Sequence, residues 1–141
     1  MEALAWIPSH PWAWPALEVV HLVGIAVLLG PLVLFELRVW GAGAALEVQP
    51  LARFALSLSI TGFGLAAASG LTLFLTSPGE LLANRAFVVK MALLAVLGAN
   101  ALWFHWRGGV RRLDRPARIQ TALSLGLWLA VIICGRWIAY V

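Results

Sequence analysis

The sequence predicts an all-α fold, an integral membrane four-helix bundle with both the N-terminus and the C-terminus on the outer (periplasmic) side. Three observations lead to this prediction. Of the 141 residues, 62% are hydrophobic and 11% are charged, and the mean hydropathy is +0.93, so the bilayer rather than water must serve as solvent. The apolar residues form four Leu- and Ala-rich runs of about twenty residues, the length of a transmembrane helix. Arginines gather in one short loop between the last two runs.

The four predicted spans are separated by prolines, glycines and charged residues. They cover about residues 16–37, 51–76, 86–106 and 119–140, and they form a single transmembrane domain over residues 1–141. Tryptophans at both ends of the first span are typical of membrane interfaces. Residues 1–15 are too short to span the bilayer and are rich in Trp and Pro, so we expect them to lie on the outer surface.

Small residues recur at every fourth position of the second span. Gly62, Ala66 and Gly70 therefore share one helical face. Such a face lets a neighbouring helix approach closely, either within the bundle or between protomers.

The arginine loop sets the predicted topology. Arg107, Arg111, Arg112, Arg115 and Arg118 face a single acid, Asp114. By the positive-inside rule this loop is cytoplasmic, which places both termini outside in a multi-pass protein of the bacterial inner membrane. We interpret the net charge of +4 as a topology signal and expect no nucleic-acid partner.

Ionisable side chains inside the spans are expected to form two layers. Each costs roughly 2.5 to 3.5 kcal/mol on insertion scales, which makes each a functional candidate. Those near the outer ends of their helices are Glu18, His21, Lys90 and Arg136. Those near the cytoplasmic ends are Glu36, Arg38, Arg53 and His105.

His21 is the first candidate metal ligand. A haem b group needs a neutral imidazole in an apolar slot, with cations near its propionates. Lys90 and Arg136 lie at a similar depth and could supply these cations, while Glu18, one turn away, could pair with the imidazole. The alternative is a histidine hydrogen-bonded to Glu18 or to a backbone carbonyl, without a cofactor. No second axial ligand is obvious, so the iron would be five-coordinate or would recruit His10 from the surface segment.

His105 is the second candidate metal ligand, at the other end of the bundle. It is an aromatic-belt residue beside Phe104 and Trp106, a ligand of a second haem, or a proton relay with Glu36. His21 and His105 differ in height by roughly 20 Å at 1.5 Å per residue, so they cannot bind one metal within a protomer. Copper is less expected than haem b, because the chain has no Met-rich cluster.

The pattern of residues resembles a family of uncharacterised bacterial four-helix membrane proteins. The resemblance covers nearly the whole chain after residue 14 and implies the fold without an activity. In layout, the first-helix histidine and the later lysine are similar to HemJ-type protoporphyrinogen oxidases and CopD-type copper-resistance proteins, and the HemJ resemblance implies a haem b site. The residues that carry the family resemblance include Trp14-Pro15, Glu18-Val19-Val20-His21, Gly24, Ser69-Gly70, Lys90, Phe104-His105 and Gly135-Arg136.

Three functions remain open from the sequence. The leading hypothesis is a haem b-binding membrane protein for electron transfer or redox sensing, with a membrane redox partner or as a homo-oligomer. The second is a structural or accessory membrane subunit whose polar layers join helices. The third is a proton or metal transporter. An enzyme is conceivable only through the HemJ-like layout, because the chain has no recognisable catalytic motif.

Overall fold

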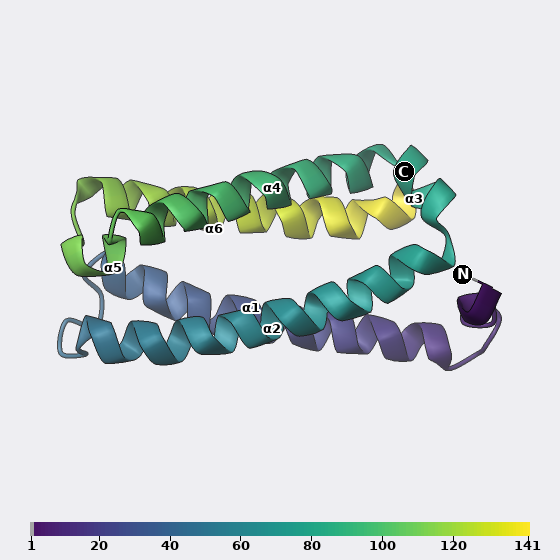
Figure 1. Cartoon of the computed structure of the whole chain (residues 1–141), viewed down its shortest axis with the longest axis horizontal. Coiled ribbons are helices and arrows are strands. Elements are labelled where there is room, and N and C mark those ends of the chain that lie inside the picture. The colour runs from purple at the N-terminus through teal and green to yellow at the C-terminus, as the bar shows by residue number, and fades with distance from the viewer. Residues whose placement is uncertain (1) are drawn as a thin grey trace.

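A computed structural model describes residues 2–141, and Met1, the first residue of the predicted surface segment, lies outside the described residues. The described chain is all-α (Figure 1). In chain order the elements are the 3-10 helix η1 (Glu2–Leu4), α1 (Ala13–Val39), α2 (Val48–Thr76), α3 (Pro78–Ala83), α4 (Arg85–Trp106), α5 (Gly109–Arg112), α6 (Arg115–Trp137) and the 3-10 helix η2 (Ile138–Tyr140).

The long helices form two antiparallel pairs. Helix α1 packs along α2, and α4 packs along α6, while the pairs meet mainly through α1 and α6. Figure 1 shows both termini and α3 at one end of the bundle, which we call the terminal end. The opposite end carries α5 and the loop between α1 and α2, and we call it the arginine end.

Four helices are long and apolar enough to cross a membrane, which makes the chain a multi-pass membrane protein. They are Ala13–Val39, Val48–Thr76, Arg85–Trp106 and Arg115–Tyr140. Large hydrophobic side chains along all four are exposed, among them Val19, Phe54, Leu102 and Leu129. This apolar exterior contacts lipid, as the sequence predicts.

Glycines bring α1 and α2 into backbone contact. A Cβ atom built on Gly62 would lie 2.3 Å from the backbone nitrogen of Leu28, and one on Gly24 would lie 2.6 Å from the backbone nitrogen of Ala66. No side chain larger than hydrogen fits in either place. The predicted small-residue face of α2 therefore packs inside the bundle, against α1.

The buried apolar core lies near the arginine end, where all four long helices contribute. Phe35 and Phe104 meet edge to face, with ring centroids 6.1 Å apart. The core residues are Phe35, Val39, Ala52, Ala55, Phe104 and Ala117. At the terminal end the pairs are joined differently, by stacking of Phe74 on Phe87 at 5.6 Å.

Side-chain caps explain why two helices begin before the predicted spans. Asn84 accepts hydrogen bonds from the backbone nitrogens of Ala86 and Phe87, and Asp114 accepts one from Ala117. These residues satisfy free N–H groups in the first turn of each helix. Helix α6 consequently begins at Arg115 rather than near residue 119, because a cap can start a helix in the polar loop outside the apolar run.

The glycine contact gives a direct test. Gly62→Ala is expected to lower the free energy of unfolding by about 1–3 kcal/mol, because its methyl group meets backbone that cannot rotate away. Gly64→Ala is the matched control on the same helix, where a Cβ meets nothing within 4 Å. Unfolding in mixed micelles measures both, and equal stability of the two variants would contradict the packing.

Candidate functional site

His21 on α1 is hydrogen-bonded to the backbone of α2. Its Nδ1 lies 2.9 Å from the carbonyl oxygen of Ala66 and 3.1 Å from Oγ of Ser69. A carbonyl can only accept, so Nδ1 carries the hydrogen and donates it. In the neutral imidazole this leaves the lone pair on Nε2.

The imidazole of His21 packs against the small-residue face of α2. The Ser69 hydroxyl donates to the carbonyl of Leu65 at 2.8 Å, which leaves its oxygen free to accept from His21. A Cβ on Gly70 would lie 3.1 Å from Cε1 of His21, so glycine makes room for the ring. The sequence analysis gave Ser69 no role, although its place three residues after Ala66 and beside Gly70 could have indicated one.

Lys90 approaches His21 from the other helix pair. Its ammonium lies against α6, where a Cβ on Gly135 would be 3.6 Å from Nζ. Lys90 is half-buried and close enough to His21 and Cys134 for electrostatic interaction. His21, Ser69, Lys90 and Cys134 thus bring all four long helices to one level of the bundle.

The expected pairing of Glu18 with His21 is wrong. Glu18 is exposed, and its Oε1 accepts a hydrogen bond of 3.0 Å from the indole nitrogen of Trp14. Three residues along a helix rotate a side chain by about 300°, so Glu18 points about 60° away from the direction of His21. With His21 facing α2, the Glu18 carboxylate is left at the surface.

Arg136 does not join the His21 and Lys90 group either. It is exposed, and its guanidinium donates to the Tyr140 hydroxyl at 3.0 Å while lying 5.3 Å from that ring's centroid. Its neighbour Gly135 faces Lys90, and successive helical residues differ by about 100° in direction. The expected outer layer is thereby reduced to His21 and Lys90.

The predicted layer near the cytoplasmic ends does not form one cluster, because His105 and Glu36 lie in different surroundings. His105 is exposed at the arginine end, with its ring 5.3 Å from that of Phe104, which takes the buried position. Glu36 is only 5% exposed, and its Oε2 has no hydrogen-bond partner among the described residues. Ser124 on α6 is its polar neighbour. No hydrogen bond joins His105 to Glu36 among residues 2–141, and the ring of His105 lies against that of Phe104 instead.

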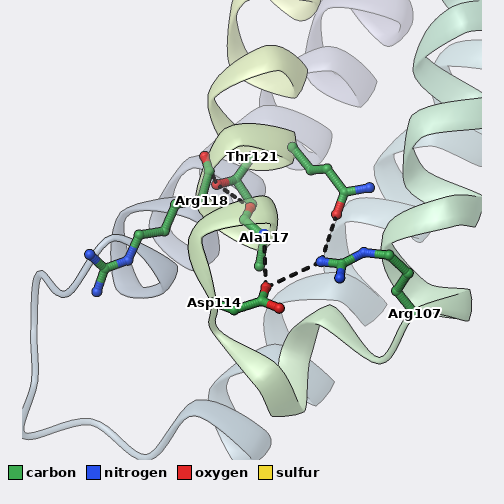
Figure 2. Close-up of polar contacts among 6 residues, drawn as sticks. Arg107, Asp114, Ala117, Arg118 and Thr121 are labelled. Atoms are coloured by element: carbon green, nitrogen blue, oxygen red, sulfur yellow. Dashed lines mark hydrogen bonds and ion pairs between the residues drawn. The ribbon is translucent and has the colours of Figure 1, made fainter.

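A polar network closes the arginine end. Arg107 contacts Asp114 at 3.2 Å and the side-chain oxygen of Gln120 at 3.4 Å, and Figure 2 shows Asp114 between Arg107 and the backbone of Ala117. The hydrogen bond from Arg107, followed by that from the Ala117 N–H, holds the pKa of Asp114 below its ordinary value. Asp114 therefore remains ionised as a cap and as a counter-ion.

Side chains that could ligate a metal are not clustered in the described part of the chain. Residues 2–141 contain no group of three or more His, Cys, Asp or Glu side chains able to hold a metal ion. His21 has an oriented Nδ1–H, and its Nε2 lies outside every hydrogen bond of the described residues.

Comparison with protein-family models, curated proteins and solved structures gives no match to this chain. The family resemblance and the HemJ-like layout therefore stay predictions.

The Asp114 carboxylate predicts a pH dependence of stability. Its pKa is lower in the folded chain than the unfolded value of about 3.9, so the ionised group adds stability above that pH, and the contribution is lost as the pH falls through the depressed folded pKa. Asp114→Asn should be less stable than the wild type at neutral pH and equal to it in strong acid. Unfolding measured across pH tests this, with exposed Glu47→Gln as the control; a pH-independent difference would contradict it.

Proposed function

We propose that this chain is a haem b-binding protein of the bacterial inner membrane, with His21 as axial ligand and with electron transfer or redox sensing as its role. The observation that supports it is the hydrogen bond from Nδ1 of His21 to the Ala66 carbonyl. Such a bond fixes the ring orientation and the tautomer, and it makes the imidazole a stronger ligand through its other nitrogen. Haem supplies one-electron exchange between its ferrous and ferric states.

The surrounding residues fit haem in part. Lys90 provides a cation near His21, and apolar helices exclude water. Glu18 and Arg136 are directed elsewhere and are not needed for the proposal. His10 lies outside the helices, where its Nδ1 accepts from the backbone nitrogens of Trp12 and Ala13. His21 would therefore be the residue that holds the haem, and His10 is not needed for the proposal.

The proposed orientation places the arginine end in the cytoplasm. Five arginines and one aspartate lie between residues 107 and 118, and Arg38 and Arg53 are at the same end. Both termini would then be periplasmic. This orientation puts His21 in the periplasmic half of the bilayer, within reach of a partner on that side.

The second candidate is a cofactor-free accessory subunit, favoured by the use of polar groups to join helices. Trp40, the residue after α1, donates to Thr121 of α6 at 2.7 Å, and Asn100 donates from α4 to the Gln120 carbonyl at 3.0 Å. The His21 bond to Ala66 has the same form. Helix association through such bonds needs no cofactor.

Absorption spectra separate the two candidates. Protein purified from haem-supplied cells is expected to show a Soret band that sharpens on reduction with dithionite. His21→Ala should lose at least nine-tenths of the bound haem, because its iron ligand is gone. His105→Ala, with the same substitution at an exposed site at the other end, should keep the band.

A folded, colourless wild-type protein, or a band that persists in His21→Ala, would overturn the haem proposal. If His21→Ala reduces helix association without any pigment in the wild type, the accessory-subunit function takes its place. Ser69→Ala keeps His21 and should leave haem bound, which separates loss of the ligand from loss of packing.

A further inference from the structure

The arginine end has a polar pocket that the proposed function does not use. It measures about 540 Å³, and its lining includes Gln49, His105, Arg107, Arg111 and Arg112. Arg107 is paired with Asp114, which is the one ion pair found in residues 2–141. Arg111 and Arg112 are exposed and have no acidic partner among those residues. The pocket thus holds positive charge that nothing in the described chain neutralises.

The backbone around these two arginines has a defined shape. Helix α5 carries both, and it lies between two residues in the left-handed region, Gly108 at φ 71° and Leu113 at φ 46°. Leu113 packs against the buried core, and Gly109 sits against the ring of Phe104. A non-glycine residue at positive φ persists only where its surroundings hold it there. The short helix is therefore tied to the bundle.

A shallow, open apolar pocket on the surface of α4 shares a lining residue with the polar one. It measures about 430 Å³ and is lined by Leu102, Trp103 and Trp106. Trp106 lines both pockets and is the last residue of the span α4. Leu102 is 75% exposed and Trp106 is 87% exposed, so both side chains point outward from the bundle. The two pockets together place unpaired cations at the membrane boundary and an apolar groove next to them within the bilayer.

We propose that this double pocket binds an anionic phospholipid, with its phosphate at Arg111 and Arg112 and an acyl chain along Leu102, Trp103 and Trp106. Charge complementarity selects an anionic headgroup over a zwitterionic one. The apolar pocket selects a lipid over a free phosphate, because only a lipid fills both halves. The site lies at the opposite end of the bundle from His21 and does not rest on the haem proposal.

Lipid binding by the detergent-purified full chain tests the proposal. Native mass spectrometry with phosphatidylglycerol and phosphatidylcholine of equal acyl chains measures the preference. The double variant Arg111→Gln, Arg112→Gln should weaken phosphatidylglycerol binding about thirtyfold. Each basic residue near a membrane surface raises the affinity for an anionic lipid about fivefold to sixfold. Binding of phosphatidylcholine should change little.

The matched control removes the same charge from the same loop. Arg115 and Arg118 on α6 are exposed and do not line the pocket, and Figure 2 shows Arg118 directed away from Arg107. Arg115→Gln with Arg118→Gln should keep phosphatidylglycerol binding within about threefold of the wild type, because only long-range attraction is lost. Equal weakening by both double variants would overturn the proposal, since the loop would then attract anions only by its total charge.

A second arm separates a lipid from a free anion. Glycerophosphoglycerol, the headgroup without chains, should compete at least a hundredfold more weakly than phosphatidylglycerol, because it leaves the apolar pocket empty. Competition at equal concentration would overturn the lipid assignment in favour of a simple phosphate site. Circular dichroism of every variant checks that the helices persist. All four arginines are exposed, so we expect their replacement to leave the fold intact.

Discussion

The contact between the backbones of Gly24 and Gly62 determines how the other groups meet. Because the two helices approach without side chains between them, donors on each reach carbonyls on the other. Ser59 of α2 donates to the Leu28 carbonyl of α1 at 2.8 Å, and His21 of α1 donates to the Ala66 carbonyl of α2 at 2.9 Å. Lipid gives helices no hydrophobic reason to associate, so close packing and such bonds must hold the pair. The position of His21 is a consequence of the glycine contact.

The two ends of the bundle differ in what joins the helix pairs. Near the arginine end, the core around Phe35 and Phe104, together with the bond from Trp40 to Thr121, fixes α1 against α4 and α6. Near the terminal end, half-buried His21 and Lys90 lie where the pairs face each other. Val110 and Leu113 of the arginine loop pack against the core at the arginine end.

Sequence reasoning recovered the helices and the small-residue face, because length, hydropathy and spacing encode them directly. The four runs became four long helices, and Gly62 and Ala66 became the α2 side of a close contact. It failed on Glu18, because a shared helical face gives direction only within about 60°. The indole N–H of Trp14 donates a hydrogen bond to the Glu18 carboxylate. Both possible partners of Glu18, Trp14 and His21, lie on the same helix, and the packing of α2 against α1, which turns His21 toward Ala66, decides between them. The sequence of α1 alone does not show that packing. His105, exposed beside Phe104, agrees with the aromatic-belt alternative. Phe104, and not its neighbour His105, is buried in the core.

Glu36 shows why helix joining alone does not account for the polar residues. The hydrogen bonds of His21, Asn100 and Trp40 satisfy their donors, as expected of groups that join helices. Oε2 of Glu36 is buried without a hydrogen-bond partner in the described chain, although Ser124 of α6 lies next to the carboxyl group. An unmade hydrogen bond inside a protein costs about 1–3 kcal/mol. Leucine at this position would avoid that cost and still fill the space. Glu36 lies about 22 Å from His21 along α1. One helix thus carries an oriented imidazole toward one end and a buried acid toward the other.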